Sequence, residues 1–268
     1  MKQVKLFAVA LTLLLGISLT SCLNTESDPI VTVPVYGECV NYYPPTFSMA
    51  SGQQVVLSGT TETFTPGNMY FFYFQYDSTQ QSAEAESITG TLYAGSTASD
   101  LTAKGSEGPI SESSYSQANA PMFALSGYIS VIYGGAGNIE PFVGFDNKWL
   151  FLPMAYWIKV VSDEDEQKIE LDKHTFVLTY NMDEVKNGDT ELVLTLNHVV
   201  ADGSEENVER KSSYYAGLKA YNLSYAIYAF QGKAGVKPTR LKVVTKTNSS
   251  NDSLDGATES VWSCDIKD

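Results

Sequence analysis

The chain contains only two histidines, His174 and His198, and each lies in a segment with the alternation of a β-strand, HTFVLTY and LVLTLNH. Every second side chain of a strand shares a face, so each histidine shares its face with apolar residues of its own segment. The turn-rich stretch 181–191 predicts that the two strands are antiparallel neighbours. If Tyr180 pairs with Leu192, His174 stands directly opposite His198, with the Cβ atoms about 5 Å apart.

Two imidazoles at that distance could bind one metal ion, with Asp172 or Asp202 as a third ligand. Zinc sites usually have three or four protein ligands, so a pair alone favours a second interpretation. In that interpretation His174 and His198 end an apolar face and bond to nearby backbone. We assign no metal and no cofactor, and keep the two histidines as candidates only.

Other catalytic patterns are absent from the sequence, which has no Gly-x-Ser-x-Gly, Cys-x-x-Cys, His-Glu-x-x-His or phosphate-loop motif. Carboxylates are abundant, so a pair for glycoside hydrolysis stays open. Trp149, Trp157 and Trp262 could stack on sugar rings, but each lies in an expected strand, where a core role is commoner. No catalytic residue is assigned, and we expect a non-enzymatic protein.

The N-terminal segment has the features of a secretory signal. Lys2 and Lys5 flank the start of an apolar run, Leu6–Leu19, which is shorter than the ~20 residues that span a bilayer. The sequence LTSC, ending at Cys22, resembles the bacterial lipobox, in which the cysteine is acylated after cleavage. Several acyl chains anchor stably, so we expect residues 1–21 to be removed and 22–33 to tether the protein to the cell envelope. The outer membrane is the expected site, on its periplasmic or cell-surface face. The alternative is an ordinary signal peptide with a chance cysteine.

Charge is distributed unevenly along the chain, whose net charge is −14. One basic residue stands against twelve acidic residues in 23–146, whereas 147–268 holds fourteen basic and nineteen acidic residues. This step predicts a domain boundary at 146/147. It also excludes nucleic acid as a partner of the first half, because binding a polyanion requires Lys and Arg. Anionic membrane surfaces are disfavoured for the same reason.

Four further residues are candidates for modification in the envelope. Cys39 and Cys264 could form a disulfide, although two separate thiols are the favoured interpretation. Ser78 and Ser253 lie in the triplets Asp-Ser-Thr and Asp-Ser-Leu, which resemble an O-glycosylation pattern of some anaerobic diderm bacteria. Such short triplets also arise by chance.

The rest of the chain predicts an all-β protein, because short runs rich in Val, Ile, Tyr, Phe and Thr alternate with turn residues. In the first half we expect strands at 31–39, 53–58, 69–76, 87–93 and 128–133, with MYFFYFQY (69–76) buried on both faces. In the second half we expect 148–152, 156–161, 168–171, 174–180, 190–199, 223–230, 241–247 and 260–266, with the acidic run 163–166 as a hairpin tip. This spacing is typical of a β-sandwich.

The order of these features resembles one known family. A lipobox, an acidic β-domain, and then KHTFVLTYN (173–181), TELVLTLNH (190–198) and AYNLSYAIY (220–228) are similar to the NigD-like lipoproteins. The resemblance implies an OB-like β-barrel over 34–146 and a β-sandwich over 147–268, and it brings no established catalytic residues. A fimbria-type lipoprotein of paired sandwiches is the alternative.

The expected function is a binding or interaction module. OB-like barrels bind oligonucleotides or oligosaccharides, and the charge count removes the first. We therefore expect a lipid-anchored envelope protein that recognises a glycan or a protein. A structural surface subunit and a lipid-anchored polysaccharide hydrolase are the alternatives.

Overall fold

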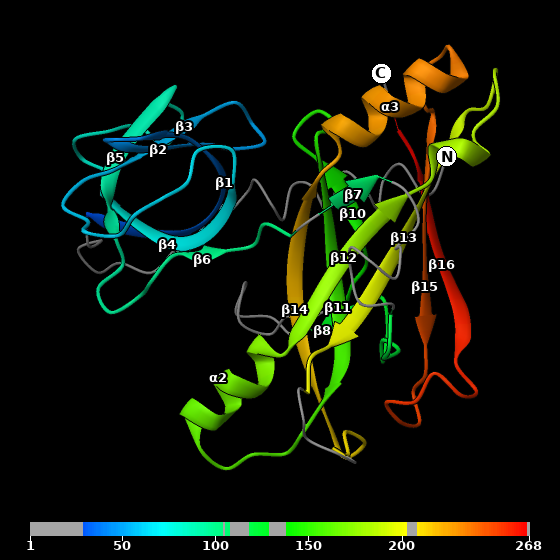
Figure 1. The fold of residues 1–268 in the computed structure, drawn as a ribbon. Coiled ribbons are helices and arrows are strands. Elements are labelled where there is room, and N and C mark those ends of the chain that lie inside the picture. Colours follow the sequence, from blue (N-terminus) through cyan, green and yellow to red (C-terminus); the bar gives the residue numbers. More distant parts are fainter. Residues whose placement is uncertain (1–28, 104, 108–117, 129–137, 203–207, 267–268) are drawn as a thin grey trace. The chain divides into compact units, whose positions relative to one another are not determined.

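The computed structural model describes residues 29–103, 105–107, 118–128, 138–202 and 208–266, and the fold is mostly β (Figure 1). Cys22 and the signal segment lie outside the described residues. The chain divides into two compact units, one of residues up to 67 with 71–98, the other of 68–70 with 99 onward. This division lies well before the 146/147 step in charge. Within the described ranges, no helix is both long and apolar enough to cross a membrane.

The first unit is a closed, five-stranded OB-like barrel, as predicted. Its strands are β1 (Ile30–Tyr42), β2 (Pro45–Ser48), β3 (Gln54–Leu57), β4 (Met69–Asp77) and β5 (Ser87–Leu92). They follow the order β1-β2-β3-β5-β4, and a pairing between β1 and β4 closes the sheet on itself. β3 and β5 run parallel, while the pairs β1–β2, β2–β3 and β4–β5 are antiparallel. Residues 30–33 belong to β1, so the expected tether, 22–33, is wrong at its C-terminal end.

Strand β4 has one buried face rather than the two that its apolar sequence predicted. Phe72, Phe74 and Tyr76 are buried, and the residues between them are partly exposed. The prediction failed because a small closed barrel has only one interior. Gly90 of β5 allows the wall to close tightly, since a Cβ there would lie 2.0 Å from the carbonyl oxygen of Gln75.

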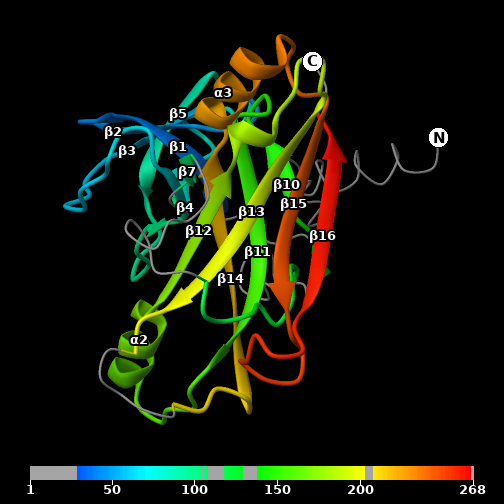
Figure 2. The same cartoon turned by 45° about the vertical axis from the view of Figure 1, so that its right-hand side comes forward.

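The second unit contains a β-sandwich, which confirms the predicted architecture (Figure 2). One sheet has the order β10-β11-β14 and the other the order β16-β15-β13-β12-β7. The bounds are β7 (Gly105–Glu107), β10 (Phe142–Gly144), β11 (Trp149–Ile158), β12 (His174–Tyr180), β13 (Glu191–Val200), β14 (Ser213–Asn222), β15 (Arg240–Thr247) and β16 (Thr258–Asp265). The short strands β6 (Ser99–Asp100), β8 (Gly127–Tyr128) and β9 (Asn138–Ile139) complete the described strands.

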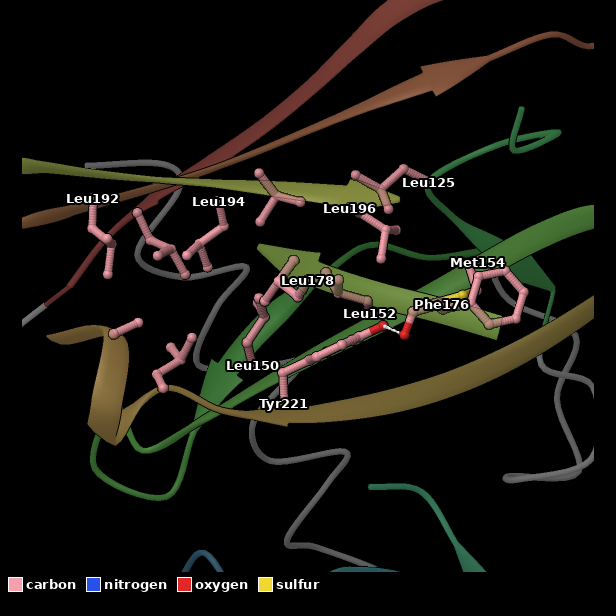
Figure 3. Close-up of a cluster of buried hydrophobic side chains, with 14 of the residues drawn as sticks. Leu125, Leu150, Leu152, Met154, Phe176, Leu178, Leu192, Leu194, Leu196 and Tyr221 are labelled. Atoms are coloured by element: carbon pink, nitrogen blue, oxygen red, sulfur yellow. Dashed lines mark hydrogen bonds between the residues drawn. The ribbon is translucent and has the colours of Figure 1, made fainter. Parts of the chain in front are cut away.

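The two sheets enclose one apolar core, which is drawn in Figure 3. β11 is buried along its whole length and was predicted as two separate strands. Its Leu150 and Leu152 share the core with leucines of β12 and β13, among them Leu178 and Leu194. Burying a side chain of this size stabilises the fold by about 1.5–3 kcal/mol. The core therefore fixes how the two sheets face each other.

Two segments predicted as strands are helices. Residues 168–171 lie in α2 (Glu164–Asp172), and residues 224–230 lie in α3 (Ser224–Ala234). The side chain of Asp163 accepts hydrogen bonds from the backbone N–H groups of Asp165 and Glu166, so the acidic run begins a helix instead of forming a hairpin tip. α3 buries every fourth residue, Ala226, Phe230 and Ala234, and ends at Gly235 with φ 77°. A single 3-10 turn, η1 (Met182–Glu184), follows β12.

One further segment, 119–125, connects the sheets at the side of the sandwich. Isolated β-bridges join Ala120 to His198 of β13, Met122 to Thr247 of β15, and Ala124 to Ala155 of β11. Because its backbone bonds to strands of both sheets, this bridging segment is held at a fixed position. It forms one wall of a groove whose other wall includes residues of β15 and β16.

Candidate binding groove and the buried histidine network

A groove of about 360 Å³ opens in the second unit between the bridging segment and the β15–β16 hairpin. It is lined by aromatic, hydroxyl-bearing and small apolar side chains with one carboxylate: Phe123, Ala124, Leu125, Ser126, Glu140, Pro141, Thr247, Ser260, Val261 and Trp262. Its volume lies near the lower end of the ~300–1,000 Å³ that small-molecule sites occupy. The described lining contains no lysine or arginine.

Backbone hydrogen bonds hold the aromatic wall of the groove. The Met122 N–H donates to the carbonyl oxygen of Lys246 at 2.8 Å, and the Phe123 N–H donates to that of Ala155 at 2.9 Å. The Phe123 ring lies edge-on to Trp157, with centroids 5.0 Å apart. Trp157 is itself fixed, because its indole N–H donates to the carbonyl oxygen of Asn248 at 2.9 Å. The Phe123 ring is thus preorganised before any ligand arrives.

The three tryptophans differ in burial and in whether they line the groove. Trp149 and Trp157 are buried, as the core interpretation predicted. Trp262 lies opposite Val243 on the outermost strand of its sheet, packs against the core and is partly exposed in the groove. Of the three, it alone presents an indole to the groove.

These side chains suit a sugar. Aromatic faces can pack against the apolar face of a sugar ring, while hydroxyl and carboxylate oxygens can bond its hydroxyl groups. Ser126, Thr247 and Ser260 supply the hydroxyls, and Glu140 supplies the carboxylate. An arrangement of this kind can form contacts with a polar ligand that has one apolar face.

The two histidines lie on neighbouring antiparallel strands and meet, but in a register shifted by two residues. Phe176, not His174, stands opposite His198, and His174 stands opposite Val200. The imidazoles still share one face of the sheet, and His174 Nδ1 lies 2.9 Å from His198 Nε2. The predicted neighbourhood is confirmed and the predicted register is wrong.

Hydrogen-bond chemistry fixes the tautomers of this pair. His198 Nδ1 lies 3.1 Å from the carbonyl oxygen of Pro121, which can only accept, so this nitrogen carries the proton. His198 Nε2 must then accept, and His174 Nδ1 donates to it. His174 Nε2 has no proton left when the ring is neutral, which agrees with its longer separation of 3.5 Å from Glu170 Oε1. The pair thereby holds the bridging segment through Pro121.

Behind the histidines lies a buried ion-pair network. Arg210 Nε lies 2.6 Å from Glu170 Oε1, and Arg210 Nη1 lies 2.8 Å from Asp202 Oδ2, with a second contact to each carboxylate. The side chains of Arg210 and Glu170 are 4% and 3% exposed, so water contributes little to their solvation. Lys173 Nζ also approaches Glu170, at 3.9 Å.

This environment moves the pKa values of the network's carboxyl groups and imidazoles. Burial alone would raise the pKa of Glu170, but hydrogen bonds from Arg210 and the Lys159 N–H outweigh it and hold that pKa at about 2. The hydrogen bonds from Arg210 also lower the pKa of Asp202. Burial lowers the pKa of His174 to about 4, with Arg210 adding to the effect, and burial next to His174 lowers that of His198 to about 3. Both imidazoles are therefore neutral near pH 7.

The network offers the metal hypothesis no third ligand. Asp172 is exposed at the end of α2, and Asp202 bonds to Arg210. The parts of the chain that the structure describes contain no group of three His, Cys, Asp or Glu side chains suited to a metal ion. His174 and His198 instead bond to each other, and His198 bonds to backbone.

The sequence alone did not reveal Glu170 and Arg210 of the network, or Phe123 of the groove. Glu170 lies on α2 and His174 begins β12, so their contact depends on how the chain turns between the two elements, and no regular helix or strand spacing predicts it. Arg210 and Phe123 carry no local signal, because their partners are far away in sequence.

None of the four candidate modification residues is among the described residues that line the groove. Ser78 and Ser253 are both exposed, and the Ser78 hydroxyl donates to the carbonyl oxygen of Pro29 at 3.0 Å. Cys39 is buried in the barrel and Cys264 is partly buried in the sandwich, and both are free thiols. Burial raises the pKa of each thiol, to about 11 for Cys264, which keeps them protonated near pH 7.

The histidine pair predicts a stability that falls on acidification. A histidine with a depressed folded-state pKa takes up its proton only on unfolding, so stability is lost as the pH drops below the unfolded value of 6.5. We expect the free energy of unfolding, measured with urea, to fall by about 1 kcal/mol or more per pH unit between pH ~6.5 and ~4.5. Glu170, with an unfolded value of 4.5, contributes only below this window. The variant His174→Gln/His198→Gln should show a flat profile there; a slope equal to that of the natural chain would contradict the assignment.

No protein-family model matches the chain, and no curated protein does. Among solved structures, the chain is similar to a protein of Bacteroides fragilis named "Putative lipoprotein (BF3042)". The two share 27% sequence identity with a TM-score of 0.70 over 89% of this chain and 98% of that one. An uncharacterized protein from Parabacteroides merdae follows, with 12% identity, a TM-score of 0.49, and coverage of 89% and 100%. A Bacteroides vulgatus protein of unknown function (DUF1344) has 10% identity, a TM-score of 0.47, and coverage of 87% and 91%.

Proposed function

We propose that this chain is a non-enzymatic lipoprotein of the bacterial envelope, of the NigD-like kind, and that its groove binds a glycan. The lipobox at Cys22 supports the anchor, and so does the similarity over nearly full length to a Bacteroides protein named as a lipoprotein. The sequence resemblance and the barrel-then-sandwich order support the family.

The observation that carries the proposed function is the groove itself. It places the partly exposed Trp262 and the fixed Phe123 beside three hydroxyls and one carboxylate. A protein partner would more often meet a broad apolar patch with arginine and aromatic anchors. The described lining is small and mixes aromatic with polar side chains, which favours a sugar.

The same lining argues for binding without hydrolysis. Glycosidases of the common kinds use two carboxyl groups, about 5–5.5 Å apart in retaining enzymes and ~6.5–9.5 Å apart in inverting ones. Among the described residues that line the groove, Glu140 is the single acidic one. This described lining does not supply the second acid that such a mechanism requires.

Replacing Trp262 by alanine should remove glycan binding. The test uses the chain from residue 22 with Cys22→Ser, applied to a glycan array and to immobilised envelope polysaccharide. We expect Trp262→Ala to weaken retention by about tenfold or more, because the indole supplies the main apolar contact.

Tyr225→Ala is the matched control, since this ring is 79% exposed on α3 and does not line the groove. It should bind like the parent chain. Retention that Trp262→Ala leaves unchanged would refute the site. Capture of envelope proteins without glycan would point to a protein partner, and release of shortened glycan would point to a hydrolase.

A further inference from the structure

The aromatic surface of the groove continues beyond its lining. Phe123 stacks on Tyr214 of β14, with ring centroids 4.7 Å apart and planes 7° apart. The Tyr214 ring does not line the groove and is 51% exposed. One face of the Tyr214 ring therefore covers Phe123, and the exposed half of the tyrosine adds aromatic surface next to the groove.

Tyr214 contributes little to the core, and its exposed half is available for contact with a ligand. Half of its area stays in water, so it contributes less to folding than its size allows. Its partner Phe123 is locked by backbone bonds and by the edge of Trp157. A ligand that packs on this pair would order few side chains, which lowers the entropic cost of binding.

The size and the charge of the groove restrict the class of ligand that it can bind. At about 360 Å³ the groove is small, so a ligand that gains more contact must extend out of it. With Glu140 in the groove and no basic residue in its described lining, an anionic chain would lack compensation for its charge.

We propose that the groove binds a neutral oligosaccharide chain, with one sugar against Trp262 and Phe123 and the following units over Tyr214. This rests on the proposed function and adds the ligand class, neutral and longer than two sugars. Affinity then increases with chain length, and Tyr214 supplies the increase.

The test is titration calorimetry with neutral disaccharides and hexasaccharides of glucose, galactose, mannose and N-acetylglucosamine. For at least one series, the hexasaccharide should bind about tenfold or more tightly than the disaccharide. Tyr214→Ala should reduce hexasaccharide affinity to the disaccharide level and leave disaccharide affinity unchanged. Tyr214→Phe keeps the stacked ring and should retain the gain with length, whereas Trp262→Ala should weaken both ligands.

The outcomes separate the two proposals. Equal affinity for both lengths, or an equal loss for both in Tyr214→Ala, overturns the inference and leaves the groove as a glycan site. Tighter binding of an oligogalacturonate than of every neutral hexasaccharide overturns the assignment of a neutral ligand. Binding of no oligosaccharide overturns the proposed function together with the inference. A thermal melt of each variant confirms that it is folded.

Discussion

Replacing Arg210 by methionine is expected to lower the free energy of unfolding by about 3–5 kcal/mol. The guanidinium bonds to Glu170 and Asp202, and the Glu170 side chain is only 3% exposed. Removing the cation leaves a buried carboxylate without its strongest partner. The pKa of Glu170, now held at about 2, should then rise. Urea denaturation at pH 7 measures the loss directly.

Arg240→Met is the matched control for this prediction. Arg240 also pairs with a glutamate, Glu191, at 3.4 Å, but the two side chains are 52% and 41% exposed. A surface pair of this kind contributes about 1 kcal/mol or less. Equal losses in the two variants would show that burial does not set the effect. Replacing Glu170 by glutamine as well should recover part of the stability lost in Arg210→Met, since no buried charge then remains unpaired.

Replacing Cys22 by alanine is expected to move the protein from the membrane to the soluble fraction. The prediction rests on the lipobox, because Cys22 lies outside the described residues. Acyl chains on the cysteine supply the anchoring free energy, about 0.8 kcal/mol for each buried CH₂. Fractionation of cells, with labelling by a palmitate analogue, measures both the position and the modification.

Cys264→Ala provides the control, because this thiol is free and lies in the sandwich. It should stay in the membrane fraction and keep its label. A Cys22→Ala protein that still fractionates with membranes and still carries the label would refute the anchor.

Local patterns were enough to predict most of the longer strands, although β14 was missed. In β13 the alternation of apolar and polar residues matches the pleat, and the predicted bounds of β12 and β13 agree with the observed ones within one residue. α2 and α3 were missed because both are short; α2 has no apolar stripe, and the stripe of α3 consists of only three residues. α2 has a capping aspartate and one buried glutamate, and α3 buries small residues, alanines, at two of its three core positions.

The histidine pair shows which contacts can still be predicted when the strand register is predicted wrongly. The predicted register assumed that 181–191 is a simple turn, but η1 occupies part of this segment. The resulting shift is two residues, which keeps every side chain on its face because the strand repeat is two. The meeting of His174 and His198 was therefore predictable, whereas their diagonal contact, the bond to Pro121 and the proximity of Glu170 were not.

The groove could not have been predicted from sequence. Phe123 reaches it through bridges to strands of both sheets, and Trp262 reaches it at the edge of one sheet. These placements depend on non-local pairing, which a single sequence does not encode in any local pattern. Only the residue type of Trp262 suggested a sugar contact in advance.

The central claim is that a neutral sugar chain binds at Trp262, and a crystal structure of the chain with a bound neutral hexasaccharide tests it most directly. The account predicts one sugar ring against the Trp262 indole and Phe123, hydroxyl groups within hydrogen-bond distance of Glu140 or the groove hydroxyls, and further units over Tyr214. A hexasaccharide located on the barrel or on the exposed tyrosines of α3, with the groove empty, would contradict it.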